Sequence, residues 1–232
     1  MKLSFYPLIT VGFLLAFSAH AQPRKPIAKI PNKQQLIALT FDDGPNEVTP
    51  KILDILKRCG VHATFFEIGK NVKKHPDLSR QVLQEGHQIG NHSMTHPRLD
   101  NLSDTDAIRQ EITGFQNLIQ NLTGETPTVF RAPYFSMDER VWSVLDELQL
   151  PAFVRSVGGD YKADKKDLFT NPEVAQKHAQ EVVQMVKKSG SGTIILMHER
   201  DITPYYLERV VQDLQAAGFH FVTLSQLLAV AP

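Results

Sequence analysis

Two adjacent carboxylates end a short apolar run in the segment Ala38-Leu39-Thr40-Phe41-Asp42-Asp43-Gly44-Pro45. The run predicts a β-strand, and the Gly-Pro break after it places both acids at the C-terminal tip of the strand, where α/β enzymes carry their chemistry. Two neighbouring carboxylates repel each other unless a cation neutralises one of them. The alternative is that Asp42 and Asp43 only cap the following turn, because Asp is common before Gly.

A pair of histidines follows in Asn91-His92-Ser93-Met94-Thr95-His96. Their spacing of four positions can bring both imidazoles to one side of a turn. Two histidines and one carboxylate form a common open site for Zn²⁺ or another divalent ion. Such an ion lowers the pKa of a bound water and polarises a carbonyl oxygen, which leaves the second acid of the strand tip free to act as a general base.

Three further polar residues follow strand-like segments. Arg131, in Phe130-Arg131-Ala132-Pro133-Tyr134-Phe135, can pair with a carboxylate and hold it ionised. His198, which follows the apolar run Thr193–Met197, can protonate a leaving group. Asp160, in a Gly-Gly-Asp turn, can orient a histidine. Each segment taken alone also fits a role without chemistry, as a surface arginine, a strand-end histidine and an ordinary turn.

The elements that must position these residues alternate along the chain without a repeat. Helix starts carry capping side chains and first-turn prolines, as at Asn171-Pro172 and Thr203-Pro204. Regular β–α alternation predicts an α/β protein with a mostly parallel sheet, either open or an incomplete barrel. The candidate strands are seven short apolar segments: Leu36–Phe41, Ala63–Ile68, Gln88–Asn91, Val129–Ala132, Ala152–Val157, Thr193–Met197 and Phe221–Leu224.

The composition excludes several classes of protein. The chain has 232 residues, with 25 Lys and Arg against 25 Asp and Glu. This balance gives no electrostatic reason to expect nucleic acid or an anionic membrane as a partner. Cys59 is the only cysteine, so the protein is not a disulfide-stapled scaffold and must be held together by its core.

The first 21 residues have the features of a signal peptide. Lys2 precedes an apolar run from Leu8 to Phe17, and Ala19-His20-Ala21 forms a small-x-small cleavage site. The run is short for a membrane span, and the alternative is an uncleaved N-terminal anchor. We expect an exported protein, periplasmic or extracellular, that begins near Gln22 and is not stably inserted in a membrane. Residues 22–35, rich in Pro and Lys, are expected to be an extended segment.

Taken in order, four of these segments resemble the motifs of the polysaccharide deacetylase family, also called the NodB homology domain or carbohydrate esterase family 4. Thr40–Gly44 is similar to the first motif, His92–His96 to the second, Arg131–Tyr134 to the third and Ile195–His198 to the last. The resemblance covers about Leu36 to Leu228 and places the catalytic domain at residues 36–230. It implies a distorted (β/α) barrel with about seven parallel strands.

The resemblance implies a metal site with a base beside it. Asp43, His92 and His96 would bind one divalent metal ion, with Zn²⁺ expected and Co²⁺, Ni²⁺ or Mn²⁺ as other suitable ions. Asp42 would be the base, and Arg131 would position it.

The resemblance also implies an acid and a substrate pocket. His198 would protonate the departing amine, oriented by Asp160. The backbone N–H of Tyr134 would help to stabilise the oxyanion, and Leu196 would line the pocket for the acetyl methyl group. Where the family usually has Asp-Trp, this chain has Asp followed by Tyr161, which gives a smaller aromatic wall that carries a hydroxyl.

The function that the resemblance implies is hydrolysis of N-acetyl groups in glycans that contain N-acetylglucosamine, such as chitin oligosaccharides or peptidoglycan. The expected partner is the glycan substrate alone, and the protein is expected to be a monomer. The alternatives are an O-acetyl esterase acting on acetylated xylan and a non-catalytic carbohydrate-binding relative. A glycosidase needs two carboxyl groups roughly 5–10 Å apart across a glycosidic bond, an arrangement that Asp42 and Asp43, adjacent at one tip, do not readily offer.

Overall fold

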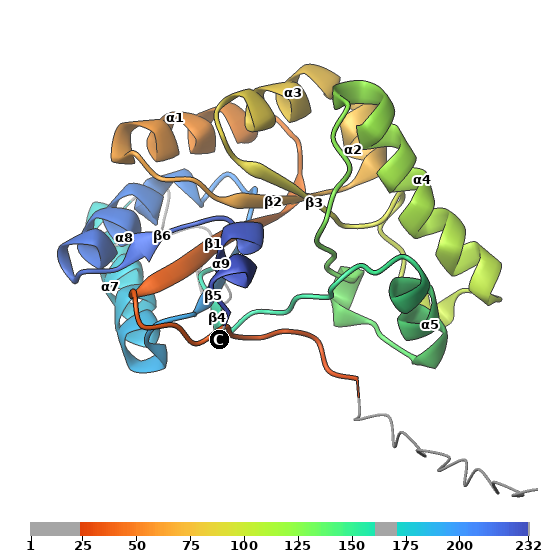
Figure 1. Cartoon of the computed structure of the whole chain (residues 1–232). Coiled ribbons are helices and arrows are strands. Elements are labelled where there is room, and N and C mark those ends of the chain that lie inside the picture. The colour runs from red at the N-terminus through yellow and green to blue at the C-terminus, as the bar shows by residue number, and fades with distance from the viewer. Residues whose placement is uncertain (1–23, 161–170, 232) are drawn as a thin grey trace, which may run out of the picture.

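A computed structural model gives the structure of the protein and describes residues 24–160 and 171–231 (Figure 1). The predicted signal peptide at residues 1–21 lies outside the described residues, and so does Tyr161. In the described ranges, no helix is both long enough and apolar enough to cross a membrane.

Six parallel strands form one sheet in the described part of the chain. β1 is central, because it pairs with β2 and β5 along its length and with β6 at its start, in the order β3-β2-β1-β5-β4. The strands are β1 (Leu36–Gly44), β2 (Thr64–Glu67), β3 (Gln88–Asn91), β4 (Val157–Gly158), β5 (Ile194–His198) and β6 (His220–Phe221). The predicted α/β fold with a parallel sheet is confirmed.

The predicted strand at residues 129–132 is reduced to single bridges, which is why the structure has six strands where about seven were expected. Phe130 bridges Asn91 on one side and Ala152 on the other. Pro133 and Pro151 limit the ladders here, because proline has no N–H to donate. The six strands do not close a barrel by themselves, and these single bridges continue the sheet beyond β3.

Helices lie on the outside of the strands, with α1 and α3 on one side, α7 and α8 on another, and α4 and α5 on a third (Figure 1). They are α1 (Thr49–Cys59), α2 (Gly69–Lys74), α3 (Pro76–Gln84), α4 (Thr105–Thr123), α5 (Glu139–Glu147), α7 (Pro172–Ser189), α8 (Pro204–Ala216) and α9 (Leu224–Ala229), with short 3₁₀ turns at Leu99–Asn101 and Pro133–Phe135.

The predicted helix caps are only partly correct. Asn171 caps α7 by accepting a hydrogen bond from the Glu173 N–H, as predicted. Thr203 precedes α8 but does not cap it with its side chain, since its hydroxyl donates to the carbonyl oxygen of His198 at 2.8 Å. This residue therefore ties the start of α8 to the end of β5.

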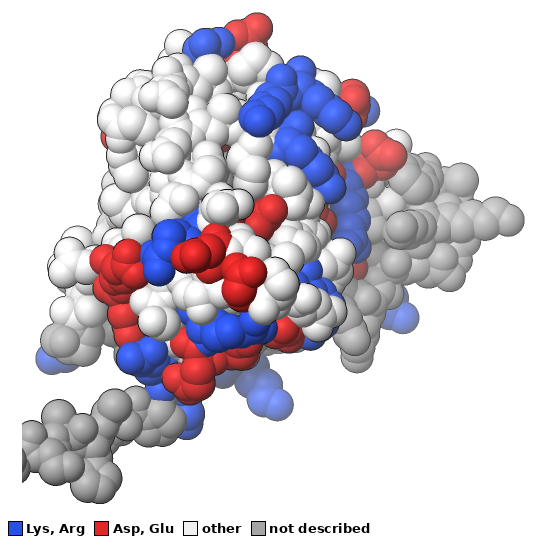
Figure 2. Space-filling model, turned by 90° about the vertical axis from the view of Figure 1, so that its right-hand side faces the viewer, with Lys and Arg blue, Asp and Glu red and all other residues white. Residues whose placement is uncertain are grey.

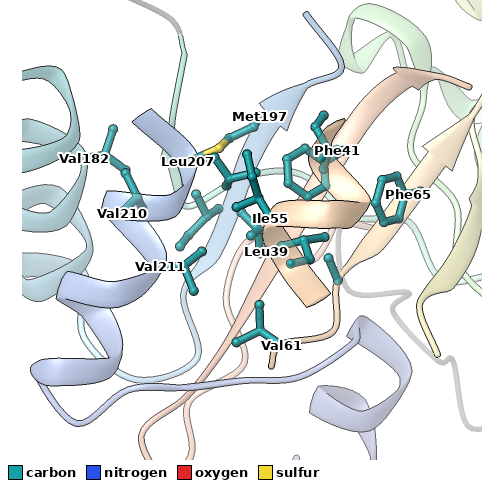
Figure 3. Packing of buried hydrophobic residues seen from close by; sticks show 14 of the residues in the cluster. Leu39, Phe41, Ile55, Val61, Phe65, Val182, Met197, Leu207, Val210 and Val211 are labelled. Carbon is teal, nitrogen blue, oxygen red and sulfur yellow. The ribbon is translucent and has the colours of Figure 1, made fainter. Parts of the chain in front are cut away.

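Successive side chains of β1 pack on opposite faces of the sheet and enter two different apolar clusters. Leu39 and Phe41 of β1 belong to the largest apolar cluster, which also contains Leu207 and Val210 of α8 (Figure 3). Ala38 faces the other way, into a second cluster that contains Phe66 and Ile194. Because successive side chains of a strand point to opposite faces, Thr40 and Asp42 share the face of Ala38, inside the curve of the sheet.

The segment before β1 packs along the irregular side of the sheet. The Ile27 N–H donates to the Ala152 carbonyl at 2.8 Å, and the Ile30 N–H donates to the Gly192 carbonyl at 3.0 Å. Gly192 has a φ of +80°, and a Cβ there would lie 2.0 Å from the Ile30 carbonyl oxygen, so only glycine fits this close approach. The division of the chain at residue 36 stays a prediction.

Charged side chains are mixed in sign over the surface. Figure 2 shows acidic and basic residues next to one another in the lower part of one face. Exposed ion pairs include Arg58 with Glu208 and Arg80 with Asp77. Such pairs contribute little to stability individually, and their mixture agrees with the balanced composition.

Candidate active site

The carboxyl ends of the strands bring most of the predicted site residues together. In the register of β1 and β5, Asp42 lies opposite His198. β3 ends at Asn91, directly before His92, and Arg131 follows the bridge residue Phe130. Parallel strands end at the same edge of a sheet, so these segments meet there.

Asp43, His92 and His96 form the one metal-ligand cluster found among the described residues. Their donor atoms all lie within 4.8 Å of one another. Asp43 Oδ1 is 3.6 Å from His92 Nε2 and 3.3 Å from His96 Nε2. This arrangement brings the three predicted ligands together.

The protonation states of the cluster fit a divalent cation. His92 Nδ1 lies 2.7 Å from the Arg131 carbonyl oxygen, which only accepts, so Nδ1 carries the proton and the Nε2 lone pair faces Asp43. Burial lowers the pKa of His92, although Asp42 and Asp43 partly offset this. Burial alone would raise the pKa of Asp43, but the hydrogen bond from His96 and the nearby histidine charges lower it to about 2. A neutral imidazole and an ionised carboxylate are the metal-binding forms.

Three of the predicted site residues have left-handed backbones. The φ angles are 73° at Asp43, 66° at His96 and 56° at Tyr134. Such angles cost about 1–3 kcal/mol at a non-glycine residue and gather at functional sites. The surrounding contacts therefore hold these residues against a local preference for other conformations.

Asp42 is buried beside the cluster and paired with Arg131. Arg131 Nη1 donates to Asp42 Oδ1 at 2.6 Å and to Thr40 Oγ1 at 2.8 Å. The guanidinium is fully buried and stacks on Phe66, with Cζ 4.1 Å from the ring centroid. Asp42 Oδ2 points the other way and lies 3.9 Å from His92 Nε2. One oxygen of Asp42 is thus held by a cation while the other faces the metal-ligand cluster.

His198 is held by Asp160 on the opposite side of the site. Asp160 Oδ2 accepts from His198 Nδ1 at 2.8 Å and from the His198 backbone N–H at 2.9 Å. Burial lowers the pKa of His198, but the Asp160 hydrogen bond and the charges of Asp160 and Asp42 more than compensate, so its pKa lies above the ordinary value. Because Nδ1 donates to Asp160, Nε2 remains available to give a proton.

The remaining predicted residues lie around this centre. The Tyr134 ring packs edge-on against His96 with centroids 4.8 Å apart, and 61% of the residue is exposed. Leu196 is buried in β5, on the same strand face as His198. Tyr161 falls outside the described residues.

Two buried acids near the site were not predicted. Glu67 ends β2 and Glu199 follows His198, and burial raises the pKa of each carboxyl to about 8. Glu67 accepts from the Ser79 hydroxyl at 2.6 Å, and Glu199 accepts from the Thr49 hydroxyl. Glu67 could have been noticed in the sequence, because it is the one acid in the apolar segment 63–68.

Comparison with known proteins identifies the family. Residues 29–153 match the family model described as polysaccharide deacetylase. A peptidoglycan-N-acetylglucosamine deacetylase from Bacillus cereus is 36% identical over 205 residues, which cover 86% of this chain and 91% of that protein. The deacetylase PgdA from Listeria monocytogenes is 37% identical over 208 residues, which cover 88% of this chain and 41% of that protein. The chain therefore belongs to the polysaccharide deacetylase family.

A solved structure agrees with this assignment, although the protein it shows is a pseudoenzyme. A pseudoenzyme of carbohydrate esterase family 4 from Bacillus anthracis superposes with a TM-score of 0.76 and 28% identity, over 88% of this chain and 69% of that one. The fold of this chain is thus the fold of that family. Because a family member described as a pseudoenzyme shares the fold, the case for catalysis must come from the site itself.

Proposed function

We propose that the protein is an exported, metal-dependent deacetylase that hydrolyses the acetamide C–N bond of N-acetylglucosamine units in a glycan. One observation carries the proposal. A carboxylate held by Arg131 and an imidazole held by Asp160 lie on neighbouring strand ends, with the Asp43, His92 and His96 cluster beside them. The residues proposed as base, acid and metal ligands thus lie at one centre.

Asp43, His92 and His96 are the residues that would hold a divalent ion. Zn²⁺ suits two imidazoles and a carboxylate best, and Co²⁺, Ni²⁺ and Mn²⁺ also suit this set. Such an ion, when bound, supplies Lewis-acid polarisation of the acetamide carbonyl and lowers the pKa of water.

The protein side chains perform the proton transfers. Asp42 accepts a proton from the attacking water at Oδ2, while Arg131 holds Oδ1. His198 gives the proton on Nε2 to the amine nitrogen as the C–N bond breaks, which releases acetate and leaves a glucosamine unit. Asp160 keeps the His198 ring in the required tautomer.

The substrate pocket is proposed from residues around this centre. The Tyr134 N–H would donate to the oxyanion, and the left-handed backbone of Tyr134 and the contact of its ring with His96 support this role. Leu196 would line the pocket for the acetyl methyl group, and Tyr161 would form an aromatic wall.

The proposed glycan is inferred from the relatives, and the proposed location from the predicted signal peptide. The Bacillus cereus and Listeria relatives are peptidoglycan-N-acetylglucosamine deacetylases, so peptidoglycan is the first substrate to test. The predicted signal peptide supports export to the periplasm or medium, where that polymer lies. An O-acetylated xylan is the second candidate, since the same groups can hydrolyse an ester. The intact base and acid pairs argue against a non-catalytic role.

Acetate release from peptidoglycan, chitin oligosaccharides and acetylated xylan tests the proposal, with and without a chelator. Metal-dependent release with unchanged glycan chain length is expected, whereas shortened chains would indicate a glycosidase. Absence of release from every substrate would contradict the proposal.

The variant Asp42→Asn tests the role of the base. It should lower kcat by about 10²–10⁴-fold, because it removes the proton acceptor but none of the three metal ligands. Metal content measured on the purified variant should match that of the wild type. A variant with lower metal content and the same kcat per bound metal would show that Asp42 is not the base.

A further inference from the structure

Two helices hold the tripeptide Ser93-Met94-Thr95, which joins the two histidines of the cluster. α4 contacts it through Glu111, and α2 contacts it through its first residues. We propose that Glu111 is a positioning residue that fixes the His92–His96 loop in its metal-binding conformation. The proposal rests on the proposed function, because it assumes that these histidines bind a metal ion.

Glu111 binds Thr95 with both carboxylate oxygens. Oε2 accepts from the Thr95 backbone N–H at 2.8 Å, and Oε1 accepts from the Thr95 hydroxyl at 2.6 Å. The Glu111 backbone carbonyl also accepts from the Met94 N–H at 3.0 Å. Hydrogen bonds to an ionised carboxylate are stronger than those between neutral groups, and a two-point contact also fixes orientation. Thr95 is therefore held in place although it lies at the surface.

The first residues of α2 hold the same tripeptide from the other side. The Gly69 N–H donates to the Ser93 carbonyl at 3.1 Å, and the Lys70 N–H donates to the Met94 carbonyl at 2.8 Å. The Met94 side chain lies over Gly69, where a Cβ would come within 2.3 Å of its sulfur atom. It also lies next to Gly114 of α4. The glycine at position 69 allows the loop to sit close against α2, whereas Met94 makes ordinary contact at Gly114 of α4.

The loop needs this support because its backbone is strained at both ends. Ser93 and His96 have φ angles of 64° and 66°. Within the loop, the Ser93 hydroxyl accepts from the His96 N–H at 3.0 Å. Residues in this conformation persist only where neighbouring contacts hold them. Glu111 supplies a charged contact in the middle of the loop, beside that of Lys70 Nζ, which donates to the Thr95 carbonyl at 3.3 Å. Loss of Glu111 would therefore loosen Thr95 and allow His96 to move relative to His92.

Glu111 does not act as a ligand itself. Both of its oxygens are engaged by Thr95, and it is not among the residues whose donor atoms meet in the cluster. Its effect on the metal would therefore pass through Thr95 to His96. Groups bonded directly to metal ligands change metal affinity by about 10- to 100-fold when they are removed, and this range is the upper bound for Glu111, which acts through Thr95.

Metal affinity, measured by calorimetry with Zn²⁺ and by absorption titration with Co²⁺, tests the proposal on the full protein. Glu111→Ala should bind either metal more weakly than the wild type, by up to about 10- to 100-fold. Its kcat should return close to the wild-type value when metal is saturating, because no reacting group has changed. Glu111→Gln should lose less affinity than Glu111→Ala, since its carbonyl oxygen can accept from the Thr95 N–H and its amide can donate to the Thr95 hydroxyl, although without the charge.

Two further variants make the result interpretable. Gln110→Ala, at an exposed neighbouring position on α4, is the matched control and should leave metal affinity unchanged. Thr95→Ala removes only the hydroxyl bond and should weaken metal binding to a smaller degree than Glu111→Ala. If Glu111→Ala does not fold, Thr95→Ala decides the question, because unchanged affinity there overturns the proposal.

The failure of this inference can be distinguished from the failure of the proposed function. If the wild type binds no metal, or binds it equally well after His92→Ala, the proposed function fails. If the wild type binds metal through His92 but folded Glu111→Ala binds it equally tightly, only the role of Glu111 is wrong.

Discussion

At the scale of single residues, neighbouring acids have different environments because the backbone turns between them. Asp42 is the last residue that follows the alternation of β1, so its side chain points inward to Arg131. Asp43 has a left-handed backbone, and its side chain points to His92 and His96 instead. One acid meets an arginine and the other meets two imidazoles. This division allows two carboxylates at one strand tip to have separate roles.

The raised pKa of His198 leads to a prediction about pH dependence. As the proposed acid, His198 must be protonated to act, so kcat/KM should fall as pH rises through its pKa. Asp160→Asn removes a contribution that raises this pKa and leaves burial, which lowers it. The alkaline limb of the kcat/KM profile should therefore move to lower pH, and kcat should fall by up to about 10²–10⁴-fold.

A pH series of initial rates checks this prediction. Asp201→Asn, at an exposed position close to His198 in the chain, is the control and should keep the wild-type profile. An unshifted alkaline limb in Asp160→Asn would mean that another group sets it.

At the scale of elements, the sequence predicts where strands end better than how long they are. The tips of β1, β3 and β5 are recognisable because a buried apolar run stops at a polar residue. The segment 129–132 is apolar as well, but its flanking prolines prevent a continuous ladder, so it forms only bridges at Phe130. Glu111 was not predicted, because its contact with Thr95 depends on how α4 crosses the loop.

The contact between β2 and α3 leads to a prediction about stability. The Glu67 pKa is raised by burial to about 8, so the folded protein binds a proton that the unfolded chain releases above about pH 4.5. Stability from this group is therefore lost as pH rises from about 4.5 to 8. Relative to Glu67→Gln, the wild type should lose up to about 1.4 kcal/mol per pH unit in this window.

Denaturant unfolding between pH 5 and 8, with a chelator present throughout, measures this difference. Gln can still accept the hydrogen bond from Ser79. Glu47→Gln is the control because its side chain is 86% exposed, and it should follow the wild type. Parallel stability curves for wild type and Glu67→Gln would show that Glu67 is ionised in the folded protein.

At the scale of the whole molecule, the site is shared between two halves of the sheet. The metal-ligand cluster is carried by the ends of β1 and β3, and the Asp160–His198 pair is carried by the β4 and β5 side. The segment before β1 packs between the two sides, through Ala152, which bridges Phe130 beyond β3, and through Gly192, which leads into β5. Composition indicated an extended segment there, but its packing partners are distant in sequence and could not be predicted.

Removal of this segment should affect the metal-ligand cluster and the Asp160–His198 pair differently, because β1 and β3 pair with β2 independently of it. A truncated chain that begins at Asn32 loses the buried Ile30 and the half-buried Ile27, together with their backbone hydrogen bonds. Burial of two such side chains stabilises by about 2–5 kcal/mol, which corresponds to a Tm lower by about 5–15 °C. A chain that begins at Arg24 retains these contacts and serves as the control.

Below its Tm, the truncated chain should keep the metal affinity of the control but have a lower kcat. The truncation removes contacts of Ala152, which precedes Asp160 in the chain, and of Gly192, which leads into β5. β1 and β3 lose none of their pairing with β2. Calorimetric metal titration and acetate release, measured on the same samples, separate the two effects. Equal losses of metal affinity and kcat would show that the sheet responds as one unit, and an unchanged Tm would show that the N-terminal contacts do not stabilise the fold.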